Sequence, residues 1–309
     1  MKEQLLKKLK HPLRSEGLEL KDDHILQGTV SQDQFVVKEG IPQLLAAQAE
    51  TTVRNAALHQ NLQSEFNYVD HYQQDALVFD YFTDFEDGPT LHENRRLHEA
   101  IIAQVPKEAK EILDIGCGKA WAAGHFAPRK DLVCSFDIST TNTEKAVQTY
   151  PVDNHVAVVG DVYHLPFQEN TFDALISAEV IEHVPEVEAY LRELIRVCRP
   201  GGKIIISTPY DEKIAMHLCV HCNRPTPSHA HLHTFNRAKV AAILEPFKGL
   251  KWETQVLSNK ALLKLRTHLI LQFLPFSLWR MVDRLANRFY KKPTRLLILL
   301  EKEEAVEMG

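Results

Sequence analysis

The stretch Ile112–Trp121 reads I-L-D-I-G-C-G-K-A-W, and the interpretation of the whole chain depends on it. Apolar residues surround one acid, and two glycines follow two positions apart. This pattern predicts a strand that ends in a tight turn. Glycine carries no Cβ, so such a turn lets a ligand approach the backbone closely. The remaining sequence has to show which ligand this is.

Apolar segments and helix-forming segments alternate from residue 111 onward. This alternation predicts βαβ units, and therefore an α/β fold with a parallel, doubly wound sheet and helices on both faces. The expected strands are Glu111–Gly116, Asp131–Asp137, His155–Gly160, Phe172–Ser177, Lys203–Thr208, Lys251–Leu257 and Arg295–Glu301. The expected helices are Asn55–Ser64, Leu91–Val105, Thr143–Tyr150, Glu186–Cys198 and Asn236–Phe247.

Two common ligands of glycine-rich turns do not fit the stretch. The dinucleotide fingerprint G-x-G-x-x-G would place its third glycine at position 121, where the chain has Trp121. A glycine-rich loop ending in Lys-Ser or Lys-Thr is missing from the sequence, which excludes a phosphate-binding P-loop. S-adenosylmethionine (SAM) carries no phosphate and does not need the full dinucleotide turn, so it remains as the candidate.

Three later segments fit a SAM site at the carboxyl ends of the strands. The segment V-C-S-F-D-I-S ends the next strand at Asp137, whose carboxylate can accept hydrogen bonds from both ribose hydroxyls. The segment V-V-G-D-V-Y-H-L-P-F places Asp161 after the third strand, where a carboxylate can bind the adenine amino group. A Pro-Gly-Gly turn at residues 200–202 then reverses the chain into the fifth strand.

With these motifs in this order, residues 111–210 resemble class I SAM-dependent methyltransferases of the methyltransferase-11 subgroup, which includes quinone-biosynthesis C-methyltransferases. Ala120 departs from the pattern, because many members have a third glycine there. The resemblance implies a Rossmann-like fold with a seven-stranded, mostly parallel sheet, and an enzyme that transfers the methyl group of SAM. It also implies a set of SAM-binding residues, namely Asp114, Gly116, Cys117, Gly118, Asp137, Ile138, Asp161, Val162 and Glu179. Tyr72, in an aromatic segment before the sheet, is a further candidate for SAM binding.

Candidate catalytic residues follow the fourth strand. Glu179, Glu182 and His183 are three and four positions apart, which predicts one shared helical face. Methyl transfer has a neutral leaving group, so positioning can supply up to ~7–11 kcal/mol of the catalysis, and a base is needed only if the acceptor loses a proton. His183 is the predicted base, with Glu182 beside it, because imidazole titrates near neutrality. A histidine that caps or packs the next helix is the alternative.

An aromatic-rich segment precedes the sheet and contains Tyr68 and Tyr72. Their rings can cover the sulfonium of SAM through cation–π contact. The alternative for such a stripe of aromatic residues is ordinary core packing. The sequence leaves both interpretations open.

The segment Cys219–Phe235 is rich in metal-binding side chains and reads C-V-H-C-N-R-P-T-P-S-H-A-H-L-H-T-F. Two thiols with two imidazoles form an accepted ligand set for structural zinc. The alternative is a polar loop with unligated thiols. Because the segment leaves the fifth strand at its carboxyl end, we expect it beside the acceptor site. The candidate zinc ligands are Cys219, Cys222, His229, His231 and His233.

A long insert, residues 258–293, separates the last two expected strands. From Lys260 to Arg295 the chain has nine Lys or Arg residues and one acid, Asp283. A basic, amphipathic helical pair suits an anionic membrane surface, which predicts peripheral membrane contact through residues 260–292. A helical pair packed on its own domain and a contact with RNA phosphates are the alternatives.

Residues 1–50 are expected to form a small β-rich segment ahead of a methyltransferase domain at 51–309. The pieces H-P-L-R-S-E-G-L-E-L and V-K-E-G-I-P-Q-L-L resemble the small zinc-ribbon partner of tRNA and protein methyltransferases. His11 and Arg14 stand where that family has cysteines, so the resemblance implies a ribbon without metal. A β appendage without chemistry is the alternative.

Composition and charge indicate which partners and which cellular location to expect. The formal net charge of −5 provides no basic field over the whole protein for nucleic acid. No secretory signal or membrane span is predicted, and scattered cysteines are typical of reduced thiols in the cytoplasm. The combined prediction is a cytoplasmic SAM-dependent methyltransferase with a small or lipid-like acceptor, which works at the inner membrane surface if the insert binds lipid. An RNA methyltransferase and a non-catalytic SAM-binding regulator are the alternatives.

Overall fold

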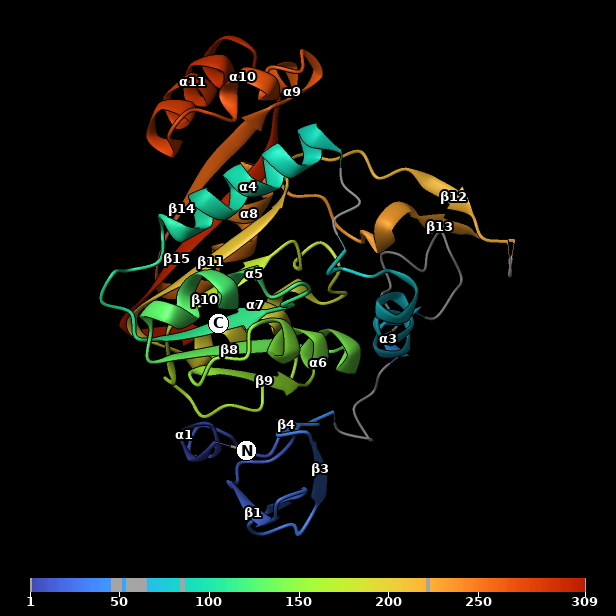
Figure 1. Ribbon diagram of the computed structural model, residues 1–309, viewed down its shortest axis with the longest axis vertical. Coiled ribbons are helices and arrows are strands. Elements are labelled where there is room, and N and C mark those ends of the chain that lie inside the picture. Colours follow the sequence, from blue (N-terminus) through green and yellow to red (C-terminus); the bar gives the residue numbers. More distant parts are fainter. Residues whose placement is uncertain (1, 46–51, 54–65, 84–86, 221–222, 309) are drawn as a thin grey trace.

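A seven-stranded sheet forms the centre of the computed structural model, which describes residues 2–45, 52–53, 66–83, 87–220 and 223–308 (Figure 1). The strand order is β14-β15-β11-β10-β7-β8-β9, and β15 alone runs antiparallel to its sheet neighbours. The predicted seven-stranded, mostly parallel sheet is confirmed. The strands are β7 (Glu111–Ile115), β8 (Leu132–Asp137), β9 (His155–Val159), β10 (Phe172–Ala178), β11 (Cys198–Pro209), β14 (Phe247–Asn259) and β15 (Pro293–Met308).

Helices cover both faces of this sheet because successive strand residues point to opposite sides. Leu113 of β7 belongs to the core cluster that contains α7 and α8, whereas Ile112 belongs to the cluster that contains α4, α5 and α6. Four predicted helices are present with shifted ends, and the expected helix Asn55–Ser64 lies outside the described residues. The helices are α4 (Gly88–Ile102), α5 (Trp121–Phe126), α6 (Thr140–Thr149), α7 (Val187–Val197) and α8 (Arg237–Leu244).

The N-terminal segment forms its own antiparallel sheet, which lies next to β9 (Figure 1). Leu5 and Leu9 are buried in the same core cluster as β7 and β8, and the Leu44 amide donates to the Val159 carbonyl at 2.8 Å. The segment therefore packs directly on the large sheet. The division of the chain at residue 50 stays a prediction. The elements are α1 (Glu3–Leu6), β1 (Leu18–Asp22), β2 (Ile25–Gly28), β3 (Gln34–Lys38) and β4 (Ile41–Pro42).

The positions that correspond to zinc-ribbon cysteines bind a carboxylate instead. His11 Nε2 lies 3.0 Å and Arg14 Nε 3.2 Å from Asp33 Oδ2. A carboxylate between these two side chains links the start of the segment to the turn before β3. The kinship with zinc ribbons itself stays a prediction.

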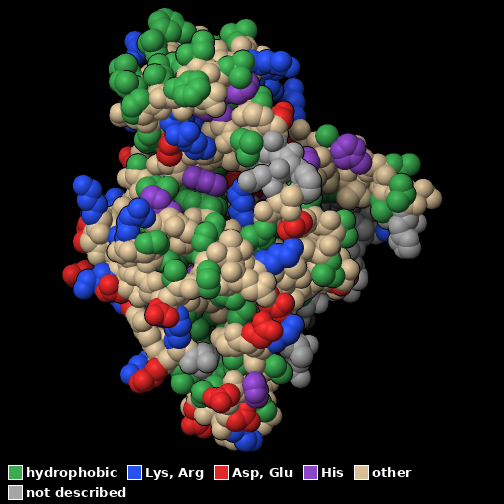
Figure 2. Space-filling model, in the orientation of Figure 1, with side chains coloured by type: hydrophobic (Ala, Val, Ile, Leu, Met, Phe, Trp, Pro, Cys, Tyr) green, Lys and Arg blue, Asp and Glu red, His purple; other side chains and the backbone are tan. Residues whose placement is uncertain are grey.

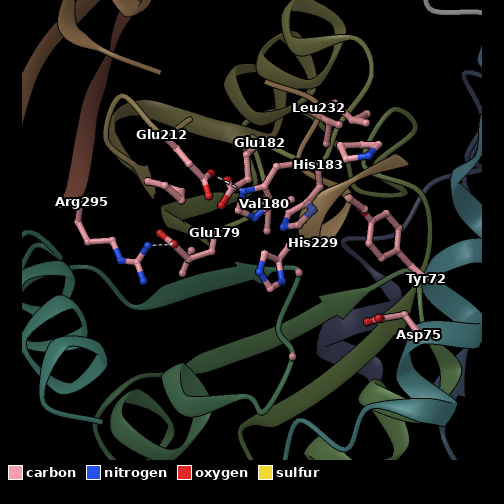
Figure 3. A pocket seen from close by; sticks show the side chains of 18 of the residues that line it. Tyr72, Asp75, Glu179, Val180, Glu182, His183, Glu212, His229, Leu232 and Arg295 are labelled. Carbon is pink, nitrogen blue, oxygen red and sulfur yellow. Dashed lines mark hydrogen bonds and ion pairs between the residues drawn. The ribbon is translucent and has the colours of Figure 1, made fainter. Parts of the chain in front are cut away.

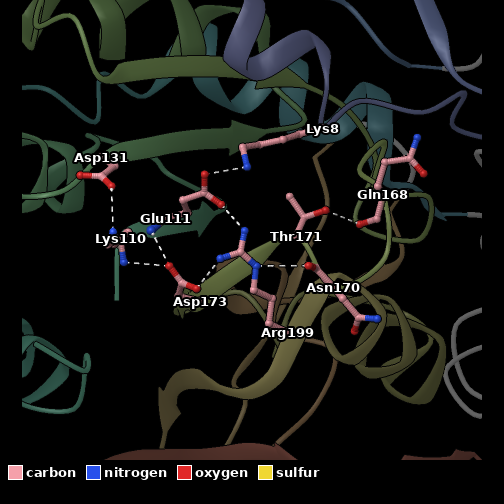
Figure 4. Close-up of polar contacts among 9 residues, drawn as sticks. All are labelled: Lys8, Lys110, Glu111, Asp131, Gln168, Asn170, Thr171, Asp173 and Arg199. Atoms are coloured by element: carbon pink, nitrogen blue, oxygen red, sulfur yellow. Dashed lines mark hydrogen bonds and ion pairs between the residues drawn. The ribbon is translucent and has the colours of Figure 1, made fainter. Parts of the chain in front are cut away.

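Ion pairs fix the amino ends of β7 and β10 (Figure 4). Arg199 pairs with both Glu111 and Asp173, and Asp173 Oδ2 accepts from the amides of Lys110 (2.8 Å) and Glu111 (2.9 Å). Lys8 of the N-terminal segment pairs with Glu111 at 2.7 Å. This network aligns the strand starts at one edge of the sheet, opposite to the carboxyl ends of the same strands.

The insert before β15 is helical, as predicted, and lies at the opposite end of the molecule from the N-terminal sheet (Figure 1). Its helices are α9 (Lys260–Lys264), α10 (His268–Leu271) and α11 (Phe276–Phe289). Throughout the described ranges, each helix is too short or too polar to cross a membrane.

Helix α11 turns polar side chains inward. Asp283 is fully buried, accepts from the Asn259 amide at 2.9 Å and pairs with Arg280 at 3.0 Å. Asn287 also donates to the Asp283 carboxylate, at 3.2 Å. The outward side of α9–α11 and their connections is apolar, and Figure 2 shows these side chains gathered over the end of the molecule that the insert forms. The exposed apolar residues are Leu265, Leu269, Ile270, Phe273, Leu278, Met281, Leu285, Phe289 and Tyr290.

The substitution Asp283→Ala tests whether this buried network holds the insert in place. It leaves the Arg280 charge and the Asn259 amide without their acceptor, so we expect the free energy of unfolding in urea to fall by about 3–5 kcal/mol. The control is Arg284→Ala, an exposed position on the same helix, where the expected change is within about 0.5 kcal/mol. Equal midpoints for the two variants would show that the network does not fasten the insert.

Candidate functional site

A cavity of about 1730 Å³ opens at the carboxyl ends of the parallel strands. Residues that follow β7, β8, β9, β10 and β11 form its floor and walls, and α3 (Tyr68–Val78) lies over it. Doubly wound sheets bind their ligands at this edge. The residues predicted from the sequence that line the cavity are Tyr72, Gly116, Cys117, Gly118, Asp137, Ile138, Val162, Glu179, Glu182, His183, His229 and His231.

The turn after β7 has no room for a side chain at Gly116. Gly116 has a φ of +64°, and a Cβ there would lie 2.5 Å from Val180 Cγ2. Gly118 also has a positive φ, of +46°. Ala120 is fully buried with a φ of +52°, a conformation that costs a non-glycine residue about 1–2 kcal/mol. The chain therefore keeps the left-handed backbone at position 120 although the usual glycine has been replaced.

The carboxylate of Asp137 joins the glycine turn to the end of β8. The Gly118 amide donates to Asp137 Oδ2 at 3.2 Å, and the Ser139 amide donates to Oδ1 at 2.9 Å. Burial raises the pKa of Asp137, while these hydrogen bonds lower it. The residue predicted to bind the ribose thus has a fixed orientation in the cavity wall.

Two other predicted acids, Asp114 and Asp161, lie behind the wall. Asp114 is buried, and its Oδ2 has no hydrogen-bond partner among the described residues. Burial, and secondarily the Asp137 charge, raise the pKa of Asp114 well above its usual range. Asp161 accepts a hydrogen bond from the Tyr68 hydroxyl, so its neighbour Val162 forms the cavity surface instead. Adenine binding by Asp161 stays a prediction.

Helix α3 covers the cavity rather than filling the core. The Tyr72 hydroxyl is buried without a hydrogen-bond partner in the described structure, and its ring lies 5.8 Å from the His183 ring. Gln73, which the sequence analysis did not single out, donates to the Ile138 carbonyl at 2.7 Å. Leu77 is exposed at the end of the helix. The aromatic stripe therefore belongs largely to the site.

The prediction of one helical face for the acids after β10 was wrong. Glu179 has a φ of +57°, and the residues after it form a turn in which the His183 amide donates to the Val180 carbonyl at 2.9 Å. Pro185 disfavours helical geometry at the residue before it, and α7 begins only at Val187. The turn nevertheless directs Glu179, Glu182 and His183 into one cavity (Figure 3).

Burial changes the acid–base character of this turn. Glu182 is almost fully buried, Thr208 donates to its Oε2 at 3.1 Å, and its Oε1 has no partner in the described chain. Burial and the Glu179 charge raise the pKa of Glu182 well above its usual range. Burial and the nearby His231 lower the pKa of His183 to about 3. The expectation that His183 titrates near neutrality therefore does not hold, and its role as a base stays a prediction.

Arg295, at the start of β15, holds Glu179 in place (Figure 3). Its Nη1 lies 3.1 Å from Glu179 Oε2, and its Nε lies 3.7 Å from Glu93. The Ser207 hydroxyl donates to the other Glu179 oxygen at 2.9 Å. No local motif in the sequence shows that Arg295, one of the basic residues counted from Lys260 to Arg295, will contact Glu179.

The loop after β11 does not place all predicted zinc ligands in the cavity. His231 Nδ1 lies 2.5 Å from Glu212 Oε2, and His229 lines the same wall. His233 instead points its Nε2 at the Pro185 carbonyl, 3.2 Å away. Cys219 lies beside the β12–β13 hairpin (Met216–Leu218 and Pro225–Pro227), and Cys222 lies outside the described residues.

A different group has the spacing of metal ligands. Glu182, His183 and His231 each offer one ligand atom, and these atoms lie within 4.8 Å of one another.

Comparison with known proteins assigns the central segment. Residues 113–206 match the family described as methyltransferase domain. Residues 113–206 are a class I SAM-dependent methyltransferase domain. Norajmaline N-methyltransferase of Rauvolfia serpentina is 35% identical to the chain over 105 residues, which cover 32% of this chain and 36% of that protein.

Two further relatives are similar to part of the chain. Sterol 24-C-methyltransferase erg6 of Schizosaccharomyces pombe is 31% identical over 150 residues, 44% of this chain and 39% of its own. Fatty-acid O-methyltransferase of Mycolicibacterium smegmatis is 29% identical over 109 residues, 35% of this chain and 40% of its own. The chain thus spans well under half of the length of these relatives. A SAM-dependent methyltransferase structure from Mesorhizobium loti has a TM-score of 0.48 at 17% identity, covering 68% of this chain and all of that one.

The carboxyl edge of the domain fits SAM chemically. The Asp137 carboxylate suits two ribose hydroxyls, and Gly116 and Gly118 present backbone without a Cβ to the same cavity. The Tyr72 hydroxyl has no hydrogen-bond partner among the described residues, and Tyr72 lines the same cavity. Its cation–π contact with the sulfonium stays a prediction. These groups of the cavity therefore suit SAM, the cofactor that the methyltransferase family uses.

The substitution Asp137→Ala should weaken SAM binding by about 10- to 150-fold, because charged hydrogen bonds contribute about 1.5–3 kcal/mol. Isothermal titration calorimetry with SAM measures the effect. Asp137→Asn keeps the side-chain volume and separates this loss from a packing defect. Asp131→Ala, an exposed aspartate before β8, is the matched control with unchanged affinity expected. Unchanged affinity in both Asp137 variants would remove this carboxylate from the SAM site.

Proposed function

We propose that this chain transfers the methyl group of SAM to an amphiphilic, lipid-like acceptor. The observation that carries the proposal is that one cavity borders both the glycine turn and the basic insert. Lys260, at the start of the insert, and Lys291 and Lys292, at its end, line the same cavity as Gly116 and Asp137. An acceptor with a polar head and an apolar body suits a cavity in this position.

The surface of the insert supports a lipid-like acceptor. Phe273 and Phe289 are each 80% exposed, whereas Asp283 of α11 is fully buried. Such an outward apolar surface with Lys and Arg around it matches an interfacial helix that lies on anionic lipid. Among the relatives of the chain, three are named for sterol, fatty acid and tocopherol, and two for norajmaline and ajmaline.

Bound SAM supplies a methyl group on a sulfonium centre, whose sulfur becomes a neutral thioether on transfer. The chain's own residues then have mainly to position and enclose the reactants, which is worth up to ~7–11 kcal/mol. Asp137 and the Gly116–Gly118 backbone would orient the nucleoside, and Tyr72 would exclude water from above. Arg295 holds the Glu179 carboxylate at the acceptor side. Burial lowers the pKa of His183 to about 3, so the neutral ring keeps one nitrogen lone pair available on the acceptor side.

SAM labelled on its methyl group tests the function directly. The purified chain is incubated with separated lipid, RNA, protein and small-metabolite fractions of its host. We expect label in the lipid fraction. Label in RNA would overturn the acceptor class and favour an RNA methyltransferase. No label in any fraction, with SAM binding measured by calorimetry, would favour a non-catalytic SAM-binding regulator.

Membrane contact is a separate part of the proposal, with an anionic lipid surface as the occupant of the exposed face of α9–α11. We expect the wild-type chain to sediment with vesicles that contain phosphatidylglycerol more strongly than with phosphatidylcholine vesicles. The double variant Phe273→Asp/Phe289→Asp should reduce this binding at least about 10-fold, since each change removes apolar burial worth about 1.5–3 kcal/mol. Val30→Asp, at an equally exposed apolar position in the turn between β2 and β3, is the control. Equal sedimentation of all three proteins would contradict membrane contact through the insert.

A further inference from the structure

We propose that Glu182, His183 and His231 bind a divalent transition-metal ion, and that the open positions of this ion hold a hydroxyl oxygen of the acceptor. The second half of the proposal rests on the proposed function and narrows its substrates to hydroxyl-bearing amphiphiles. The first half, metal binding, is independent of methyl transfer.

Two chain segments bring the three side chains together. Glu182 and His183 belong to the turn after β10, and His231 belongs to the loop between β11 and α8. The Leu232 amide donates to the Glu182 carbonyl at 2.7 Å, which fixes the two segments at the backbone. One ligand atom from each side chain lies within 4.8 Å of the other two. The cluster is therefore set by main-chain geometry rather than by long flexible side chains.

Two atoms of the cluster have unused lone pairs. Glu182 Oε1 and His183 Nδ1 are buried, and neither has a hydrogen-bond partner in the described part of the chain. Leaving such a group buried and unpaired costs about 1–3 kcal/mol each. A cation between them would satisfy both atoms at once.

Surrounding groups orient the ligands as they do in known metal sites. Glu212 Oε2 lies 2.5 Å from His231 Nδ1, so the lone pair of that ring falls on Nε2. Thr208 binds the second oxygen of Glu182, and a backbone hydrogen bond with Ala230 engages the His183 ring. Metal-binding histidines usually donate their other N–H to a carboxylate or carbonyl in this way.

The backbone before His231 is strained. His229 and Ala230 have φ values of +56° and +53°, in the left-handed region. Each costs about 1–3 kcal/mol and persists only where the surroundings require it. The strain aims His231 at the Glu182–His183 turn rather than along the loop.

Two imidazoles and one carboxylate form a partial coordination shell that leaves positions open, which is typical of transition metals that also bind a substrate. All three side chains line the cavity, so the open positions face the space of the acceptor. A hydroxyl oxygen bound to the ion loses its proton more readily, because the ion stabilises the negative charge. The proton passes to water, the oxygen forms a bond to the methyl carbon, and the carbon–sulfur bond breaks with its electron pair kept by sulfur.

Cobalt binding tests the site on the full chain without reference to catalysis. Chelator-treated protein is titrated with Co²⁺ while the visible absorption of the bound ion is recorded. We expect one ion per chain, and at least about a 10-fold weaker affinity in Glu182→Gln and in His231→Asn, since loss of even an outer partner weakens metal sites 10- to 100-fold. His233→Asn, in the same loop but turned to the Pro185 carbonyl, is the matched control with unchanged affinity.

The outcomes distinguish this site from a thiolate site in the same loop. Thiolate-to-cobalt absorption would place the ion on the cysteines of the loop and overturn the proposal. So would equal affinity in all variants, or no binding to the wild type. If His231→Asn fails to fold by thermal denaturation, Glu182→Gln, which keeps the side-chain volume, decides the question.

Methyl-transfer assays on the same samples test the role of the ion. We expect chelation to reduce transfer of labelled methyl at least about 10-fold and Zn²⁺ or Mn²⁺ to restore it, with SAM affinity unchanged. Transfer that is unaffected by chelation would overturn the acceptor role while the proposed function stands. Binding of both Co²⁺ and SAM with no transfer to any lipid would contradict the proposed function and leave the metal site intact. Transfer only to lipids without a hydroxyl group would overturn the acceptor role of the ion while the proposed function stands.

Discussion

The pairing of β15 between β11 and β14 is the constraint on which the whole site depends. Because β15 runs antiparallel, its first residues lie against the carboxyl end of β11, with Arg295 opposite Pro209. This register brings the Arg295 guanidinium to Glu179 at the acceptor side of the cavity. It also anchors both ends of the insert at the same edge. The pairing of β15 therefore positions the Arg295–Glu179 ion pair and a wall of the cavity. It also positions the exposed apolar surface of the insert.

The cavity divides into two sides with different physical character. On the cofactor side, backbone geometry dominates, since the Gly116 turn and the amides around Asp137 fix an open surface. On the acceptor side, buried side chains dominate, and Glu182 and His183 keep polar atoms without partners among the described residues. A folded chain keeps such atoms unpaired only where a ligand completes them or strain is tolerated for function.

The sequence predicted what depends on local patterns. Strand ends, the glycine turn and the position of Asp137 follow from residues close together in the chain. The ion pair between Arg295 and Glu179 joins residues 116 positions apart in sequence, and no local motif predicts it. The pKa of His183 is low because segments distant in sequence bury its ring. The ordinary pKa of histidine, which is all that the sequence offers, does not include this burial. The insert was predicted as amphipathic, but only the structure shows that the face around Asp283 is the buried one.

The most direct test of this account is a crystal structure of the chain with S-adenosylhomocysteine. We predict the ribose hydroxyls within hydrogen-bond distance of Asp137, and the sulfur open toward Glu182 and His183. This arrangement would place the reacting methyl group between the two sides of one cavity. A nucleoside bound away from the Gly116–Gly118 turn, or a sulfur directed away from the acceptor side, would contradict the account.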